Sequence, residues 1–293
     1  MQIKINDQPL DFTLERDETL GEVIRELKSW LRGSDLVLYS VKHRERELLA
    51  SPSEQWEDTA HSEIDELAVT VGPSRNLRSE NLHTVLQYLD LLDTALRHAS
   101  DQELSELTTG FSAMVESVSQ VAPGEAALQR LSELFADPAA QPLSGWPQER
   151  IDEARRLIGQ LDSLAGRRLR EIENPQAVAR ELAAALNESR ADAEQVAVLL
   201  QTGRDREAME AIIRFSELFQ SLARVLHSLA AAEHDLPSVG GKSQEEFFRE
   251  MNGFLAELVE AFAVQDSVLI GDLMEYEVAP RLEELRAALE QIL

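Results

Sequence analysis

Several short patterns hold residue types that could do chemistry, and the first is a glycine-rich segment. Ser238-Val239-Gly240-Gly241-Lys242-Ser243 contains the glycine, lysine and hydroxyl residues with which a phosphate-binding loop holds a nucleotide. That motif also needs a glycine at position 236, where this chain has Leu236, and a preceding strand, which the sequence does not predict. We therefore interpret residues 234–242 as a flexible linker between helices.

A second pattern could supply metal ligands. Glu80 and His83 are three residues apart, so a helix would present both side chains on one face. A di-iron bundle needs a second Glu-x-x-His pair and two further inward glutamates, and the sequence contains no second pair and no His-Glu-x-x-His motif. We predict no metal and no cofactor, and a structural or surface role for His83.

Paired carboxylates could share a proton in an acid–base site, and the chain has such pairs at Glu245 with Glu246 and at Glu283 with Glu284. Adjacent residues on a helix point about 100 degrees apart, which favours solvated faces over a shared site. The Gly-x-Ser-x-Gly motif of a serine nucleophile is absent. The sequence therefore predicts a protein that is not an enzyme. The alternative is an enzyme or carboxylate metal-binding protein whose site is assembled between distant helices.

One basic cluster stands out in an otherwise acidic chain, on a segment whose other face is apolar. It is a candidate partner-binding surface, and an acidic protein is the partner that it would suit. The alternative is that these arginines pair with the protein's own acidic helices. The cluster consists of Arg155, Arg156, Arg167, Arg168 and Arg170.

The overall charge narrows the class of partner. With 54 acidic against 28 basic residues the chain has a net charge of -26, which repels nucleic acids and anionic membrane surfaces at long range. We expect other proteins, neutral or basic, as partners. The chain has no cysteine, and its sequence shows neither a signal peptide nor a membrane span, so we expect a cytoplasmic protein.

The elements at the N-terminus have the alternating pattern of strands. Two strands with apolar residues at every second position are expected first, then a helix that begins with a capping box at Thr19 and Glu22 and ends at Gly33. Further strands are expected at 36–41, near 48–49 and at 67–71. The alternating apolar residues of the first two strands are Ile3, Ile5, Leu10, Phe12 and Leu14.

This order of strand, strand, helix and then two or three strands resembles the ubiquitin-like β-grasp fold. The segment 19–28, Thr-Leu-Gly-Glu-Val-Ile-Arg-Glu-Leu-Lys, looks like the start of that fold's single helix. The resemblance covers about a quarter of the chain, rests on element order, and implies a module that offers a sheet face or edge to a partner. Because the chain continues through Gly72-Pro73, it lacks the free Gly-Gly tail that such modifiers use for conjugation. The alternative is a small cap that packs against the helices.

The rest of the chain has the apolar spacing of long helices. The first is expected to begin at Ser79 as N-cap and to end near residue 99, and a capping box at Ser100 and Glu103 opens a second helix that runs to Val121. Two further hairpins are expected, with breaks at residues 203–205 and 265–266, and Pro280 should kink the last helix.

The three hairpins suggest an internal repeat, because an aromatic residue follows the break aspartate by ten residues in each case. The alternative is chance, since an aspartate near a helix N-terminus is common. The three pairs are Asp101 with Phe111, Asp205 with Phe215, and Asp266 with Tyr276.

Together these patterns predict a mainly α protein, with an α+β β-grasp domain at 1–73 followed by an all-α bundle of long antiparallel helical hairpins at 79–293. The bundle has possible sub-units at 79–136, 147–233 and 243–293. We predict a non-catalytic adaptor or scaffold for protein–protein interaction. The alternative is a cytoplasmic chaperone for secretion or flagellar export, because the helical hairpins and the acidic, cysteine-free composition resemble the small helical chaperones of that class. The stripes of apolar residues along the predicted helices also favour a homo-oligomer.

Overall fold

The computed structural model describes residues 2–10, 19–32, 34–44, 46–48, 55–98, 101–121, 125–136, 142, 145–231 and 238–291. The chain divides into two compact units, residues 1–166 and 167–293, and the boundary lies within one long helix. Each unit is described by itself. The predicted sub-units at 79–136, 147–233 and 243–293 stay a prediction.

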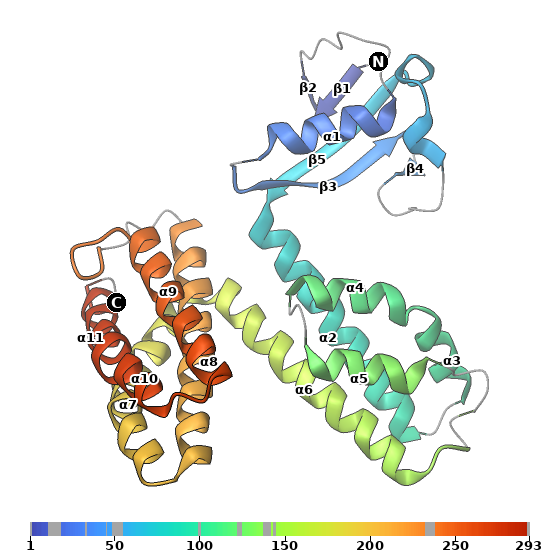
Figure 1. The fold of residues 1–293 in the computed structure, drawn as a ribbon. Coiled ribbons are helices and arrows are strands. Elements are labelled where there is room, and N and C mark those ends of the chain that lie inside the picture. The colour runs from blue at the N-terminus through green and yellow to red at the C-terminus, as the bar shows by residue number, and fades with distance from the viewer. Residues whose placement is uncertain are drawn as a thin grey trace. The chain divides into compact units, whose positions relative to one another are not determined.

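The N-terminal unit begins with a five-stranded sheet (Figure 1). Its strands have the order β2-β1-β5-β3-β4, with β1 and β5 parallel and the other neighbours antiparallel. This confirms the predicted α+β N-terminal domain. Phe12, Leu14, Gly33 and Leu49 lie outside the described residues. The strands are β1 (Gln2–Ile5), β2 (Gln8–Leu10), β3 (Leu36–His43), β4 (Arg46–Glu47) and β5 (Glu66–Pro73).

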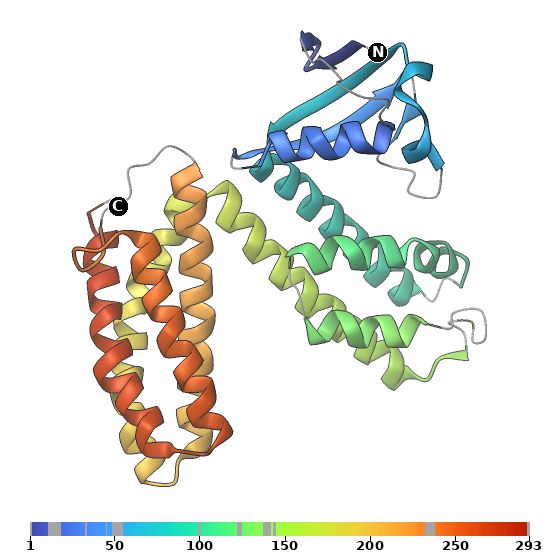
Figure 2. The same ribbon diagram turned by 45° about the horizontal axis from the view of Figure 1, so that its top comes forward.

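A single helix, α1 (Leu20–Trp30), lies across one face of this sheet (Figure 2). The predicted capping box is confirmed: the Glu22 amide donates to Thr19 Oγ1 at 3.4 Å, and the Thr19 amide donates to Glu22 Oε2 at 3.0 Å. The apolar side of α1 is buried against the strands, which gives this domain its own core. The core includes Leu20, Val23, Ile24, Leu27, Val41, Leu67 and Val69. Two short 3-10 helices, η1 (Gln55–Asp58) and η2 (His61–Glu63), precede β5.

The helices that follow differ from the prediction in two places. The chain leaves β5 directly into α2 (Ser74–His98), so Ser79 lies inside this helix and the prediction that it is the N-cap was wrong. The amide of Ser74 donates to the backbone oxygen of Asp35 at 2.7 Å, which ties the first turn of α2 to the residue before β3. The predicted helix at 104–121 is broken at Gly110, because glycine costs roughly 1 kcal/mol in a helix interior.

Four helices complete this part of the chain, and the end of the last belongs to the second unit. Ser100, which was predicted to cap the first of them, lies outside the described residues. They are α3 (Asp101–Thr109), α4 (Phe111–Val121), α5 (Ala126–Phe135) and α6 (Gln148–Glu173).

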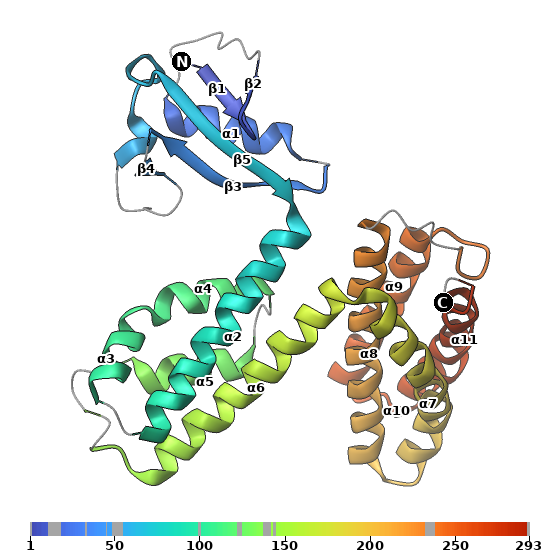
Figure 3. The ribbon, with the colours of Figure 1, turned by 180° about the vertical axis from the view of Figure 1, so that it is seen from behind.

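The second unit is an all-α bundle of antiparallel helices (Figure 3). The predicted breaks at 203–205 and 265–266 are confirmed. Helix α7 is central, because it packs on α8, α10 and α11. The helices are α7 (Pro175–Gln201), α8 (Asp205–Ala231), α9 (Gln244–Ala263), α10 (Ser267–Asp272) and α11 (Ala279–Leu289).

A π-helical segment, η4 (Leu273–Val278), joins α10 to α11. Pro280 was predicted to kink this helix, and the irregularity falls on the turn directly before it. A proline has no amide hydrogen to donate to the preceding turn, so that turn can widen. The bundle core is continuous past this segment, with Met274 and Val278 both buried.

Candidate functional site

Two helix-to-helix turns lie at one end of the C-terminal bundle, which we call the turn end. In the turn between α7 and α8, the Arg204 amide donates to the Leu199 oxygen at 2.8 Å and the Gly203 amide donates to the Leu200 oxygen at 3.2 Å. These bonds form a Schellman motif, in which Gly203 takes a left-handed conformation with φ of 72°. Glycine is the residue that this position favours.

The turn between α9 and α10 has the same geometry with a different residue. The Asp266 amide donates to the Ala261 oxygen at 2.9 Å and the Gln265 amide donates to the Phe262 oxygen at 3.1 Å. The left-handed residue is here Gln265, with φ of 57°, a conformation that costs a non-glycine residue about 1 kcal/mol. The Asp266 carboxylate then accepts from the Leu269 amide at 3.0 Å and caps α10.

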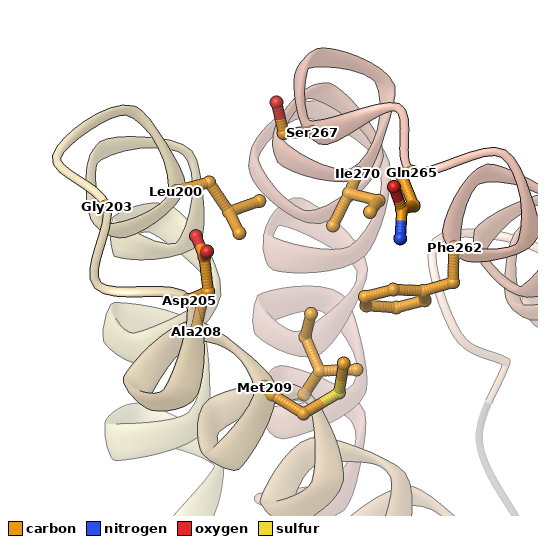
Figure 4. A pocket seen from close by; sticks show the side chains of 10 residues that line it. Leu200, Gly203, Asp205, Ala208, Met209, Phe262, Gln265, Ser267 and Ile270 are labelled. Atoms are coloured by element: carbon orange, nitrogen blue, oxygen red, sulfur yellow. The ribbon is translucent and has the colours of Figure 1, made fainter.

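A cavity of about 650 Å³ opens between these two turns (Figure 4). Met209 and Phe262 point toward one another across it, as do Leu200 and Ile270. The lining combines apolar side chains with a carboxylate, an amide and a hydroxyl. The lining residues are Leu200, Gly203, Asp205, Ala208, Met209, Ile212, Phe262, Gln265, Ser267 and Ile270.

The cavity exists because α8 and α9 are held apart. Elsewhere the bundle is tight: a Cβ on Gly271 of α10 would lie 2.8 Å from Ala197 Cβ on α7, so these two helices touch backbone to backbone. Helices α8 and α9 instead meet through aromatic side chains, with the rings of Phe219 and Phe248 5.3 Å apart. Toward the turn end no ring of that size fills the space on the α8 side, where Met209 and Ile212 stand.

Apolar side chains continue from this cavity onto the surface. Ile213 lies one helical turn from Met209 on α8, and Val259 lies one turn before Phe262 on α9. Their exposed fractions are 50% and 67%, and that of Met209 is 41%. We call the cavity together with these residues the α8–α9 groove. Val264, Val268 and Leu269 are further exposed apolar residues at the turn end.

The charged groups beside the groove are mostly acidic. Asp205 lines the cavity and Glu217 is exposed on α8, and neither carboxylate has an ion-pair partner among the residues that the structure describes. The neighbouring basic side chains are already paired, Arg204 with Glu207 and Arg206 with Glu210 at 3.6 Å. The groove therefore offers apolar contacts and uncompensated negative charge.

The opposite half of the bundle holds a buried ionic cluster. Glu171, with 5% of its surface exposed, accepts from Arg224 Nε at 2.7 Å and Nη2 at 3.0 Å, and from Ser221 Oγ at 2.6 Å. Arg168 Nη1 lies 3.3 Å from the same carboxylate. Burial raises the pKa of Glu171, and the hydrogen bond from Ser221 and the charges of Arg168 and Arg167 oppose that rise. These groups join the end of α6 to α8 and surround the buried carboxylate with donors.

The basic cluster that the sequence singled out is divided among separate contacts. Arg155 Nε lies 2.9 Å from Asp93, Arg168 belongs to the Glu171 cluster, and Arg170 Nη2 lies 2.6 Å from Glu181. Arg156 and Arg167 are exposed, with no ion pair among the described residues. Three of the five arginines thus make the intramolecular pairs that were the alternative, and a role in partner binding stays a prediction.

The glycine-rich segment forms a tight turn. The amides and oxygens of Val239 and Lys242 bond to each other at 3.0 Å in both directions, and Gly240 and Gly241 take φ of 58° and 77°. The Lys242 ammonium pairs with Glu250, and Ser243 caps α9 through a capping box with Glu246. Leu236 lies outside the described residues. Each of these groups has a structural use within the chain.

The other candidate sites involve exposed carboxylates. Glu245 pairs with Arg249 at 2.7 Å, and Glu283 pairs with Arg286 at 2.6 Å. Across the described parts of the chain, no group of three or more histidine, aspartate or glutamate side chains, Glu80 and His83 included, is placed to hold a metal ion. Nor does any helix in those parts have the length and apolar character to cross a membrane.

Sequence reasoning missed the α8–α9 groove. The helical spacing of the sequence places Ile212, Phe215 and Phe219 in one apolar stripe on α8, and these residues are buried. Met209 and Ile213 lie beside that stripe, and these extra apolar residues were the signal that could have indicated a binding surface.

Two family models match parts of this chain. The model described as TP0873 N-terminal domain matches residues 1–73, and the one described as Domain of unknown function (DUF8042) matches residues 177–288. The second match includes α8, α9 and both turns, and so the whole α8–α9 groove.

A curated relative is an uncharacterized protein of Treponema pallidum (strain Nichols). It is 33% identical over 111 residues, which are 37% of this chain and 55% of the relative. The chain thus spans about half the length of the curated relative that it matches. No solved structure matches the chain.

Proposed function

We propose that this protein is a non-catalytic adaptor or scaffold that binds another protein through the α8–α9 groove. The observation that carries the proposal is a cavity of about 650 Å³, lined by apolar and polar side chains, that continues into exposed Met209, Ile213 and Val259. Exposed apolar surface of this kind costs free energy in water and is a common mark of a protein-binding site.

The polar groups of the groove suit binding better than catalysis. Its lining holds one carboxylate, Asp205, with the Gln265 amide and the Ser267 hydroxyl, and lacks a histidine, lysine or second carboxylate to act as its partner. Such polar groups orient a partner, while the apolar lining supplies the affinity.

The N-terminal domain would be a second interaction module of the same adaptor. The sheet order, with β1 and β5 parallel and adjacent and one helix on one face, supports the ubiquitin-like β-grasp resemblance. In that case β2, at the sheet edge, could pair with an extended segment of a partner. We place both interactions in the cytoplasm, since the chain has no cysteine to form disulfides.

The exposed aliphatic residues at the turn end favour one second candidate, an export chaperone. A chaperone of this kind shields an apolar segment of a substrate until export, and the α8–α9 groove with Val264 and Val268 beside it would provide the surface. The two functions differ in what the groove holds: a stable partner complex for an adaptor, one or two exported substrates for a chaperone.

The test compares pull-downs from native lysate with three forms of the full chain. The groove variant carries Met209→Gln and Ile213→Gln, and the control carries Leu91→Gln on α2. Leu91 is the matched control because its exposed fraction of 54% is close to the 50% of Ile213. Mass spectrometry identifies the bound proteins.

A protein bound by the wild type and by the Leu91→Gln control, but lost from the groove variant, would support the proposal. Its identity would then separate adaptor from chaperone. Equal recovery by the groove variant and the control would contradict binding through the groove.

A further inference from the structure

A row of four residues on α8 has two apolar side chains in the middle and an acidic one at each end. Asp205, Met209, Ile213 and Glu217 are each four residues apart, so neighbours in this row lie one helical turn apart, and the row winds about 40° around α8 at each step. The row therefore presents two apolar side chains bracketed by a carboxylate on either side.

Each member of this row is available to a partner. Met209 and Ile213 have exposed fractions of 41% and 50%. Asp205 and Glu217 are exposed and have no ion-pair partner within the described ranges, whereas Arg204 and Arg206 are paired with Glu207 and Glu210. The row is therefore apolar at its centre and negatively charged at its ends.

The groove has a periodicity that suits a helix. It runs between two long helices, and its apolar residues on both sides recur at one-turn spacing, about 5 to 6 Å. A third helix with apolar residues at i and i+4 presents the same spacing, and its side chains would enter the cavity between Met209 and Phe262.

We infer that the occupant of the α8–α9 groove is a basic amphipathic helix of another protein, with two apolar anchors bracketed by lysine or arginine at one-turn spacing. The inference rests on the proposed function and deepens it by giving the chemistry of the partner. A basic segment would neutralise Asp205 and Glu217, which the chain itself leaves unpaired.

A second copy of this chain fits the groove less well. The net charge of -26 makes two copies repel each other, and the segments flanking the apolar stripes are rich in glutamate. Charge therefore favours a basic partner over self-association at this surface.

The test uses the full chain and two synthetic helical peptides measured by fluorescence anisotropy. One peptide carries leucine at two positions four residues apart, with lysine four residues outside each leucine. The other has glutamate in place of both lysines. We expect the lysine peptide to bind at least about tenfold more tightly, and this preference to shrink as salt is raised toward 0.5 M, roughly the range in which surface charges are screened.

Matched variants show whether the preference arises at the groove. Asp205→Asn with Glu217→Gln removes the bracketing charges, and we expect the preference for lysine to fall about fivefold, since exposed ion pairs contribute only weakly to affinity. The control, Glu257→Gln with Glu260→Gln, removes two exposed charges from another face of α9 and should leave the preference unchanged.

Three outcomes would overturn the inference: equal affinities for the two peptides, an equal fall in preference in both charge variants, or no binding of either peptide. The proposed function is judged separately. If both peptides bind equally and both lose affinity in the Met209→Gln and Ile213→Gln variant, the groove binds apolar helices and only the basic character is wrong.

Discussion

The two halves of the C-terminal bundle differ in how the space between α8 and α9 is filled. In the half away from the turns, Phe219 fills the space between α8 and α9 through ring contacts with Phe215 and Phe248, and the buried Glu171 has three hydrogen-bond donors from Arg224 and Ser221. At the turn end the same two helices leave a cavity.

Under the proposed function, this difference assigns stability to one half of the bundle and partner binding to the other. The half that holds the Glu171 cluster gains stability from these ring contacts and from the donors to a buried carboxylate. The turn end has exposed apolar surface and, at Asp205, a carboxylate without an ion-pair partner among the described residues, and the proposed function assigns these features to partner binding. Four predictions follow the contrast from its largest expected effect to its smallest.

The largest contrast is expected when one phenylalanine is removed from each half. Phe219→Ala should lower the free energy of unfolding by about 4 kcal/mol, because this ring is 3% exposed and enclosed by other side chains. Phe262→Ala should cost only about 1.5 kcal/mol, because its ring is half-buried beside a space that is already open. Urea unfolding of the full chain measures both, and equal losses would contradict the distinction between the halves.

The ionic cluster is expected to give the next largest effect. Arg224→Met keeps the length of the side chain but leaves the buried Glu171 carboxylate without its main donor, and we expect a loss of about 3 kcal/mol at neutral pH. The control is Arg170→Met, which breaks an exposed pair with Glu181 and should cost under about 1 kcal/mol. A loss of the same size in the control would show that the Glu171 cluster has no special role.

The same cluster should give stability an identifiable pH dependence. Burial raises the pKa of Glu171 above its ordinary value of 4.5, so the folded state binds this proton more tightly than the unfolded state does. The stability that Glu171 contributes by binding this proton is then greatest below pH 4.5. It is lost as the pH rises through the raised pKa of Glu171.

Removing the Arg224 guanidinium should enlarge this pH dependence of stability. In Arg224→Met the pKa of Glu171 should rise further, so the variant should recover part of its lost stability when the pH is lowered toward 5, relative to the wild type. Unfolding measured at several pH values tests this. A stability deficit that is constant across the range would count against the assignment.

Much of this architecture could be predicted from local signals. The capping boxes at Thr19 and Ser243 are encoded within four residues, and the breaks at Gly203 and Gln265 follow from interrupted apolar spacing. The N-cap prediction at Ser79 was wrong because the sequence around a serine inside a helix can look the same as that around an N-cap. The start of α2 is instead set by its direct continuation from β5.

The groove could not be predicted in this way, because it depends on distances between helices. Helical spacing separates buried Ile212 from half-exposed Ile213, but it does not show whether a space lies beside Ile213. The pairing of Arg168 and Arg224 around Glu171 is likewise invisible in the sequence, since position 171 is separated from position 224 by the whole of α7. The sequence indicated an excess of acid that would pair with these arginines, but not which carboxylate would be buried.

The smallest effect is expected at the two Schellman turns, which differ chiefly in the residue that takes the left-handed conformation. Gln265→Gly should raise the free energy of unfolding by about 1 kcal/mol, because glycine adopts positive φ without the steric cost that a Cβ imposes. Gly203→Ala should lower it by a similar amount, since it introduces that cost at φ of 72° where no other atom is near. Urea midpoints of the full chain measure both changes.

A third variant separates backbone strain from the loss of the Gln265 side chain. Gln265→Ala removes the amide from the groove but keeps a Cβ, so it should show no gain in stability. If it gains as much as Gln265→Gly, the amide itself is unfavourable at the turn end and the strain argument fails. If only the glycine variant gains, the wild-type chain accepts strain at the one left-handed position that lines the groove with a polar side chain.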